Sequence, residues 1–335
     1  MRQCLYLQGL NLFKAMMNNV LILSAGRRVE LVEAFKSELS GRFPDGKVFA
    51  VDMSPELSAA CHAAHARFTV PQVTSNEYVD RLIELCLINK IGLVIPTIDS
   101  ELLPLALEES RFKENGIYVI VSTPDLIRSC RDKRKTAVVF NEIGMVSPEI
   151  YLRDAIKFPC FAKPFDGSSS IGALLVSSQE QISQAMHDDE KLIFMQFIDK
   201  TFTEFTVDAY YDRSGVLRCF VPRERISVRA GELSKGITRR NSVYDYLFPC
   251  LSMLKGAQGC VTIQLFVNLD KLIFYALEIN PRFGGGYPLS YSAGANYPAW
   301  LITEYLLGES VSYFDHWESD LMILRYDSKI LIHGC

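Results

Sequence analysis

Short apolar runs alternate with stretches of helical apolar spacing over the first third of the chain. The runs "VLILSAGRR", "KVFAVDMSP", "IGLVIPTIDS" and "GIYVIVST" are rich in β-branched residues, which is typical of buried strands. Segments such as "VELVEAFKSEL" and "SNEYVDRLIELCLINK" lie between them and have the spacing of helices. Strands separated by helices of this length predict a parallel sheet with crossover connections. We therefore predict an open, Rossmann-like α/β domain over residues 19–123.

The pattern changes after this domain. "TPDLIRSCRDKRKTAVVFNEIG" predicts helical structure, with Thr123 and Asp125 placed to cap a helix and Gly144 to end one. From residue 158 onward the predicted strands come in adjacent pairs: "FPCFAKPF" with "GALLVSS", "LIFMQFI" with "EFTVDAYYD", and "VTIQLFV" with "LIFYALEI". Paired strands with short helices predict an α+β region of mostly antiparallel sheets.

Composition excludes several classes of protein. A formal net charge of -4 over 335 residues argues against nucleic acid as a partner, because a surface that follows phosphates needs a basic excess. The nine cysteines are scattered without a CxxC pair, which argues against a zinc site or a secreted disulfide scaffold and favours a cytoplasmic protein with reduced thiols. No apolar run approaches the roughly 20 residues of a membrane helix.

The first 18 residues, "MRQCLYLQGLNLFKAMMN", raise the alternative of a signal peptide. Gln8, Asn11 and Lys14 interrupt its apolar part, and no small-residue cleavage site follows. We favour an extension outside the fold, residues 1–18, with a natural start at Met16 or Met17.

A glycine-rich segment, "AKPFDGSSSIGALL", follows one predicted strand and precedes the next. Glycine and serine let backbone N–H groups approach phosphate oxygens, and Lys163 on the preceding strand adds a positive charge. A flexible hairpin loop with an exposed lysine has the same appearance, so both interpretations stay open.

In "IFMQFIDKTFTEFTVDAYYD", an apolar run suited to an adenine ring precedes Glu204, whose carboxylate can accept hydrogen bonds from ribose hydroxyls. A solvated acid at a strand end is the alternative.

"ALEINPRFGGGYP" places Glu278, Asn280 and Arg282 at alternate positions, so all three face one side of an extended strand. Oxygen ligands in this arrangement suit Mg²⁺, which takes one or two carboxylates plus phosphate oxygens and water. A guanidinium beyond them suits a terminal phosphate. The neighbouring segment "VTIQLFVN" carries Gln264, and a hairpin register that sets it opposite Ala276 leaves it one diagonal step from Glu278. A shift of one residue turns Gln264 to the other face.

Basic residues gather in "VPRERISVRAGELSKGITRRN". Arginines at this spacing could bind a substrate carboxylate or line the path of the transferred phosphate. An exposed basic surface without a binding role is an equally good interpretation. Arg229 is our choice for a site role, because the small and polar "AGELSKG" after it reads as a loop able to close over substrate. The turn "SAGRR" lacks the glycine fingerprint of a dinucleotide site, and we assign it to the acceptor pocket instead.

The order of these residues resembles that of the ATP-grasp superfamily, and "VTIQLFVNLDKLIFYALEINPRFGGGYPLSYSAGANYP" is most similar to the metal-binding segment of the carbamoyl phosphate synthetase large subunit. The resemblance spans residues 19–310 and implies a stand-alone ligase, since the chain is too short for that synthetase. It implies an N-terminal domain that precedes the grasp fold, a two-lobed ATP-grasp domain over residues 124–320 with lobes at about 158–200 and 201–320, and a C-terminal strand or tail over 321–335.

The resemblance also implies roles for individual residues. ATP phosphates would contact Lys133, Lys163, Ser168 and Ser169. The adenosine would lie at Gln196, Phe197, Ile198 and Glu204. Gln196 stands where a glutamate is common in the family, and the spacing before Glu204 is longer than usual. Mg²⁺, with Mn²⁺ as an alternative, would bind Gln264, Glu278 and Asn280, and Arg282, Lys163 and Arg229 would act in catalysis.

The function implied is an ADP-forming carboxylate–amine ligase that uses ATP and Mg²⁺ and passes through an acyl phosphate. Its partners would be a small carboxylate and an amine, with no nucleic acid and no membrane, and a homodimer is left open. The alternative is a nucleotide-binding or regulatory protein that keeps the grasp fold without turnover. A third hypothesis, an NAD-dependent reductase, lacks its glycine fingerprint.

Overall fold

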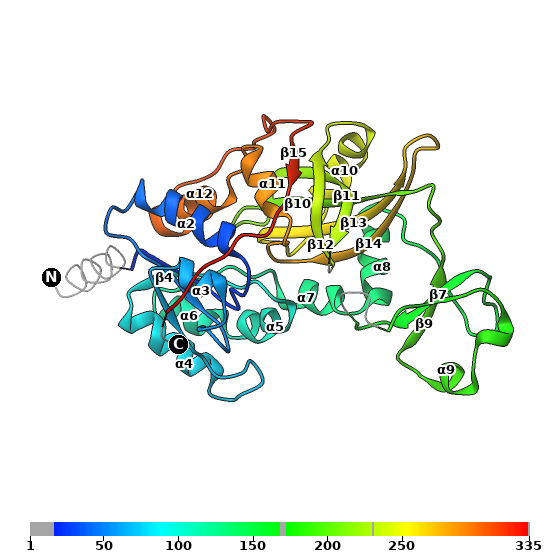
Figure 1. The fold of residues 1–335 in the computed structure, drawn as a ribbon, viewed down its shortest axis with the longest axis horizontal. Helices are drawn as coiled ribbons and strands as arrows, with labels where there is room; N and C mark the ends of the chain where they lie inside the picture. Colours follow the sequence, from blue (N-terminus) through cyan, green and yellow to red (C-terminus); the bar gives the residue numbers. More distant parts are fainter. Residues whose placement is uncertain (1–16, 168–171, 230, 334–335) are drawn as a thin grey trace.

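The computed structural model describes residues 17–167, 172–229 and 231–333 (Figure 1). Residues 1–16 and the predicted phosphate contacts Ser168 and Ser169 lie outside these ranges. Met17, which we placed in the N-terminal extension, is buried in the same core cluster as Leu21.

The N-terminal domain contains a five-stranded parallel sheet in the order β3-β2-β1-β4-β5. Its strands are β1 (Asn19–Ile22), β2 (Val48–Val51), β3 (Ala66–Phe68), β4 (Ile91–Ile95) and β5 (Tyr118–Val119). The predicted parallel sheet is therefore confirmed, with β3 as an additional edge strand. The sequence analysis missed β3 because its three residues are not fully buried and give no continuous apolar run.

Both faces of this sheet are covered, which explains why β1 is apolar at successive positions. Val20 and Ile22 pack in one core cluster, whereas Leu21 and Leu23 pack in another. The helices of the domain are α2 (Val29–Ser40), α3 (Ala59–Ala63), α4 (Tyr78–Ile88), α5 (Asp99–Leu107) and α6 (Glu109–Glu114).

Two short helices lead out of the domain: α7 (Pro124–Cys130) and α8 (Lys133–Glu142). The side chain of Thr123 caps α7, as predicted, and Asp132 caps α8 by accepting from the backbone of Arg134. The break between the helices matters for the site, because it places Lys133 in the first turn of α8.

A four-stranded antiparallel sheet in the order β6-β9-β7-β8 forms a small lobe that projects from the rest of the molecule (Figure 1). It consists of β6 (Ile150–Tyr151), β7 (Cys160–Pro164), β8 (Leu174–Val176), η1 (Gln179–Gln181), α9 (Gln184–Asp188) and β9 (Leu192–Gln196).

The large lobe is built on a six-stranded antiparallel sheet in the order β14-β13-β10-β11-β12-β15. Its elements are β10 (Thr203–Tyr211), β11 (Leu217–Arg229), β12 (Glu232–Thr238), α10 (Ser242–Ser252), β13 (Gly259–Asn268), β14 (Ile273–Asn280), α11 (Tyr287–Ser292), α12 (Tyr297–Leu301), η2 (Ile302–Leu307) and β15 (Met322–Leu324). The predicted combination of a parallel-sheet domain with antiparallel lobes is confirmed. Within the described ranges, every helix is too short or too polar to cross a bilayer.

Two local predictions were wrong. The segments at β9 and β10 do not form a hairpin, because the chain passes from the small-lobe sheet to the large-lobe sheet between them. "AGELSKG" is not a free loop, because Glu232–Thr238 pair with β11 as strand β12. Gly236 is typical of a loop, but here it permits close packing within a strand. A side chain at this position would meet Leu233 and the backbone oxygen of Glu224 at 2.8–2.9 Å.

Candidate active site

The predicted metal ligands lie together on one face of β13 and β14. Gln264 is directly opposite Glu278, and Thr262 is opposite Asn280. The register shifts between Gln264 and Leu265, so β14 holds one extra residue, Leu277, at a β-bulge. The bulge brings Gln264 closer to Glu278 than the diagonal position that we expected.

The amide of Asn280 donates to Oε1 of Glu278 over 2.8 Å, so the two side chains meet at one point. One carboxylate and two amide side chains supply hard oxygen atoms suited to Mg²⁺. The described residues contain no cluster of three or more His, Cys, Asp or Glu that could hold a metal. The residues present therefore suit a magnesium ion that takes its remaining ligands from phosphate and water, rather than one enclosed by protein.

Glu204 lies on β10, on this same sheet face. Its partner on β13 is Phe266, and Thr206, two residues farther along β10, pairs with Gln264. Residues two apart on a strand share a face. It is not the freely solvated acid of the alternative interpretation, because Nη1 of Arg225 donates to its Oε1 over 2.6 Å. Burial raises the pKa of Glu204, and nearby Glu278 adds to this, while Arg225 opposes it.

Two lysines approach Glu278 from other elements. Lys133, at the start of α8, donates to the carbonyl oxygen of Gly167 over 2.5 Å, and burial lowers its pKa. Lys163, on β7, has its pKa lowered to about 8 by burial and by the charge of Lys133. The charge of Glu278 opposes the lowering of the pKa of both lysines. The carboxylate of the large lobe thus acts electrostatically on cations of the connector and of the small lobe.

The predicted adenine contacts lie where the chain leaves β9. Gln196 is held on both sides: its Oε1 accepts from the backbone N–H of Glu149, and its Nε2 donates to the hydroxyl of Tyr275, each over 3.2 Å. Phe197 packs on Phe161 with ring centroids 5.5 Å apart, and Ile198 is half-buried beside it. The segment is therefore fixed to both lobes.

Arg282 points toward the N-terminal domain, where its Nη2 donates to Oδ2 of Asp99 over 2.9 Å. Its Nε is buried without a hydrogen-bond partner among the described residues. Asp99 was missed by the sequence analysis. Its position just after β4 was an available signal, because polar residues at the carboxyl ends of parallel strands commonly line ligand sites. A small cavity of about 30 Å³ borders Asp99, Lys133, Glu278 and Asn280.

Arg229 is not brought together with these residues. It ends β11 and pairs with Asp327 of the C-terminal segment, and both side chains are exposed. The two residues line a wide groove of about 540 Å³ beside that segment.

The basic cluster divides into structural and exposed parts. Arg223 is fully buried and binds buried Asp208 through two hydrogen bonds, of 2.8 and 3.0 Å. A side chain at Gly286 would meet Nη1 of Arg223 at 2.2 Å, so this glycine of the "GGG" run makes room for the protein's own arginine. Arg223 therefore positions the loop that follows Arg282.

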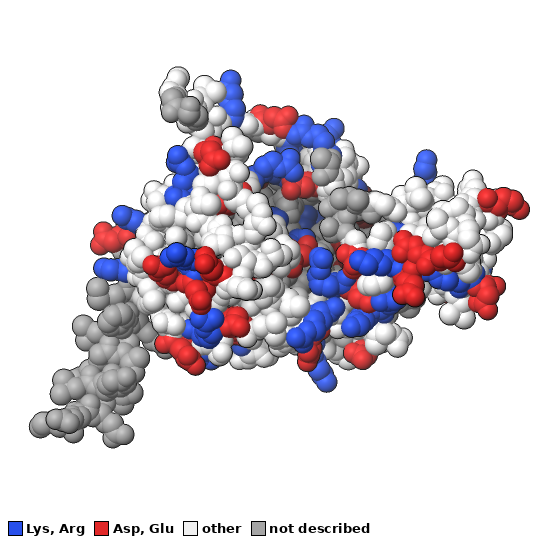
Figure 2. Space-filling model, turned by 90° about the horizontal axis from the view of Figure 1, so that it is seen from below, with Lys and Arg blue, Asp and Glu red and all other residues white. Residues whose placement is uncertain are grey.

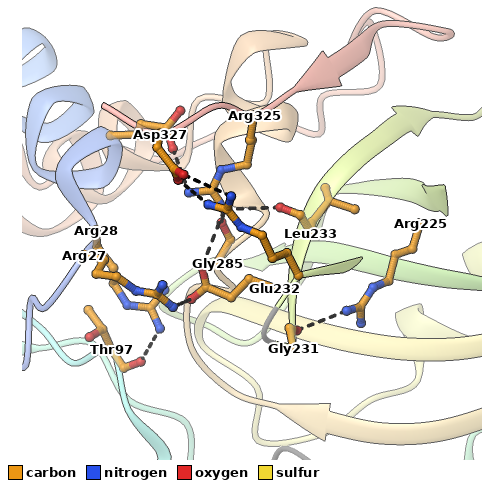
Figure 3. A network of polar contacts seen from close by, with 12 residues as sticks. Arg27, Arg28, Thr97, Arg225, Gly231, Glu232, Leu233, Gly285, Arg325 and Asp327 are labelled. Atoms are coloured by element: carbon orange, nitrogen blue, oxygen red, sulfur yellow. Dashed lines mark hydrogen bonds and ion pairs between the residues drawn. The ribbon is translucent and has the colours of Figure 1, made fainter. Parts of the chain in front are cut away.

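A second cavity, of about 200 Å³, lies where the turn after β1 faces the glycine loop. Arg27 and Arg28 of the predicted "SAGRR" turn border it, together with Glu232 of β12 and Arg325 of the C-terminal segment (Figure 3). On the face of the molecule in Figure 2, acidic and basic side chains are interspersed.

Two family profiles match the chain. One, described as the PylC-like N-terminal domain, matches residues 20–120, and the other, described as ATP-grasp in the biosynthetic pathway with Ter operon, matches residues 188–328. A search of curated proteins gives no match.

Solved structures of ATP-grasp proteins share the fold over most of the chain. The biotin carboxylase domain of Hydrogenobacter thermophilus 2-oxoglutarate carboxylase, solved with MgADP, ADP and bicarbonate, has a TM-score of 0.70 at 15% identity and covers 92% of this chain and 73% of its own. N5-carboxyaminoimidazole synthetase from Staphylococcus aureus, with ADP, gives 0.68 at 14% identity, with coverages of 88% and 78%. L-amino acid ligase from Bacillus licheniformis gives 0.62 at 17% identity, with coverages of 86% and 74%. Residues 188–328 thus match an ATP-grasp profile, and the three solved structures share the fold of most of the chain.

Proposed function

We propose that this protein is an ADP-forming carboxylate–amine ligase that uses ATP and Mg²⁺. The observation that carries the proposal is the placement of Gln264, Glu278 and Asn280 on one sheet face, within reach of the charges of Lys133 and Lys163. A triphosphate in this region would meet oxygen ligands for its metal on one side and cations on the other. Phosphoryl transfer asks a protein mainly for such positioning and charge neutralisation.

Each group has a role in this proposal. Lys133 and Lys163 hold the phosphates, Glu204 accepts from the ribose hydroxyls, and the segment from Gln196 to Ile198 lies along the adenine. When bound, Mg²⁺ would be held by Gln264, Glu278 and Asn280 and would neutralise phosphate charge. Ser168 and Ser169 remain assigned to the phosphates from the sequence alone.

The chemistry follows two displacements. A carboxylate oxygen of the substrate attacks the γ-phosphorus of ATP; the new O–P bond forms as the bond to the β-phosphate oxygen breaks and ADP leaves. The amine then attacks the acyl carbon, and phosphate leaves with the electron pair of the C–O bond as the amine loses a proton. Arg282, held by Asp99 over 2.9 Å, is placed to stabilise charge on the transferred phosphoryl group.

The similar structures support this proposal through the activities that these proteins are named for and the ligands bound to them. An L-amino acid ligase and an N5-carboxyaminoimidazole synthetase share the fold, and ADP or MgADP is bound in two of the three structures. Arg229 has no role in this scheme, since it is paired with Asp327 at the surface.

ADP release in the presence of pooled carboxylic acids and pooled amines tests the proposal. We expect release that requires Mg²⁺, an acid and an amine together, with one phosphate formed per ADP. Arg282→Ala should reduce the rate at least a hundredfold, as loss of a transition-state contact does. Nucleotide binding with no ADP release from any pair of pools would contradict the ligase and leave the non-catalytic alternative.

A further inference from the structure

The cavity of about 200 Å³ next to the β1 turn has a mixed lining. Apolar side chains form part of its wall: Ala25, Leu31, Ile98, Tyr287 and Pro288. Charged side chains also line it: Arg27, Arg28, Glu30, Glu232 and Arg325. Three arginines against two glutamates leave an excess of one positive charge around this small cavity.

The cations are not equivalent. Glu232 lies between Arg27, 3.5 Å away, and Arg325, 3.6 Å away. Arg325 also reaches Glu30 over 3.3 Å. Both glutamates therefore pair with these two arginines; Figure 3 shows Glu232 between Arg27 and Arg325.

Arg28 has no such neutralising partner. Over residues 17–167, 172–229 and 231–333 its guanidinium forms no ion pair, and its one hydrogen bond, of 2.9 Å, goes from Nη2 to the carbonyl oxygen of Thr97. A guanidinium has five N–H donors, so most of its donor capacity is unused by the protein. Burial, with a smaller effect from the charge of Arg282, lowers the pKa of Arg28 to about 10, although the charges of Glu232, Asp99 and Glu101 oppose this decrease. The group still carries a full charge at neutral pH.

One short segment anchors both arginines of the site. Thr97 accepts from Arg28, and Asp99, two residues later, accepts from Arg282. Ile98 borders the cavity beside Arg28, whereas Asp99 borders the smaller cavity that contains Glu278 and Asn280. Residues 97–99 therefore border both cavities, and the charge of Arg282 acts on Arg28.

We propose that Arg28 binds the carboxylate of a small acid that occupies this cavity, and that this acid is the substrate activated by ATP. The inference rests on the ligase proposed above for its chemistry. It extends that proposal by assigning the acid to the cavity at the β1 turn and by naming the residue that selects an anion there. A carboxylate accepts two parallel hydrogen bonds from a guanidinium, which the free donors of Arg28 can supply.

The cavity also limits the class of acid. A volume of about 200 Å³ admits a molecule on the order of seven non-hydrogen atoms, given roughly 30 Å³ for each water-sized group. The apolar wall favours an uncharged hydrocarbon body. Ile98, which borders the cavity, is 39% exposed, and an apolar ligand would cover it. The class is thus a small monocarboxylic acid with a short apolar body.

Ligand-observed NMR with a defined panel tests this directly. The probes are straight-chain carboxylic acids of two to six carbons, with and without an α-amino group, each measured beside its own amide. The full-length protein is saturated with Mg²⁺ and a non-hydrolysable ATP analogue. We expect at least one acid to bind about tenfold or more tightly than its amide, since the amide keeps the shape and loses the charge.

Three variants locate the site. Arg28→Gln should weaken binding of that acid about tenfold or more and leave its amide unchanged. Arg28→Lys should recover part of the loss, because it keeps the charge without the planar donor pair. Ile98→Trp should exclude the longer acids and spare the shortest. Arg81→Gln, on α4 and paired only with exposed Glu84, is the matched control.

Binding of the ATP analogue shows that each variant is folded. Equal binding of acids and amides by the unchanged protein would overturn the proposal, as would an Arg28→Gln protein that binds the acid normally. This binding experiment needs no turnover. If acid binding depends on Arg28 but the protein releases no ADP, the result contradicts the ligase activity and still supports the carboxylate site.

Discussion

Gln264 and Glu278 lie directly opposite each other across β13 and β14, at the point where a single extra residue, Leu277, interrupts the ladder. Ala276 and Ile279 both pack in the large-lobe core although they differ in parity along the strand. The bulge therefore satisfies two requirements at once: it keeps apolar residues inward on both sides of itself, and it keeps Glu278 and Asn280 on the face that carries Gln264.

Asp99 is expected to act by positioning Arg282. Asp99→Asn removes the charge that holds the guanidinium at 2.9 Å, so Arg282 should lose its fixed orientation. We expect kcat for ADP release to fall about tenfold, with the KM for ATP changed by less than about threefold. Asp125→Asn, at a side chain that is 97% exposed and pairs with Arg128, should match the unchanged protein. An unaltered kcat in Asp99→Asn would refute the role.

Lys163 should take up a proton when nucleotide binds. Burial and the charge of Lys133 lower its pKa to about 8, and phosphate charge will raise that pKa again. Calorimetry of Mg²⁺ and the ATP analogue at pH 8, in two buffers of different ionisation enthalpy, should therefore detect uptake of about half a proton per site. Lys163→Met should lose the uptake and exposed Lys200→Met should keep it. Identical heats in both buffers for the unchanged protein would count against this account.

The same pKa predicts how stability depends on pH. The pKa of Lys163 is about 8 in the folded protein, against an ordinary value of 10.5. Between these values the unfolded chain binds more protons, so the contribution of Lys163 to stability rises with pH across this window and is lost below it. Urea midpoints from pH 7 to 10 should rise less steeply in Lys163→Met than in the unchanged protein. Parallel profiles would contradict the shift.

The buried pair of Arg223 and Asp208 should dominate the stability of the large lobe. The two side chains are 1% and 0% exposed, so Asp208→Ala leaves an unpaired charge in the core and should cost about 3–5 kcal/mol in the free energy of unfolding. Asp80→Ala breaks the exposed pair with Arg111 and should cost less than about 1 kcal/mol. Urea denaturation measures the free energy of unfolding of both variants. Similar losses of stability would show that burial does not determine the contribution of the Arg223–Asp208 pair.

The sequence predicted the layers of the fold because its apolar periodicity records which faces are buried. Prediction from the sequence failed where one local pattern fits two structures. The strand β12 contains Gly236, which permits close packing but is also typical of a loop. The strands β9 and β10 are neighbours in sequence but belong to different sheets. Grouping of Glu278 with Lys163 followed from order along the chain. The Asp99 contact to Arg282 did not, because it joins residues 183 positions apart.

The β-bulge marks the limit of register prediction. The turn between β13 and β14 sets Leu265 opposite Ala276, and uninterrupted pairing from there would set Gln264 opposite Leu277 and turn Glu278 to the other face. Only packing of the complete sheet decides where the extra residue is accommodated. Residue types were thus enough to propose the ligand set, but the relative placement of its members depends on tertiary structure.

The central claim is that Glu278 and its neighbours bind a magnesium-bridged nucleotide. Isothermal titration calorimetry of the non-hydrolysable ATP analogue, with Mg²⁺ and with a chelator, tests it in the unchanged protein and in Glu278→Gln, a variant of nearly the same shape without the charge. We predict binding that requires Mg²⁺ and weakens at least tenfold in Glu278→Gln. Equal affinity with the chelator, or full affinity in the variant, would contradict the account.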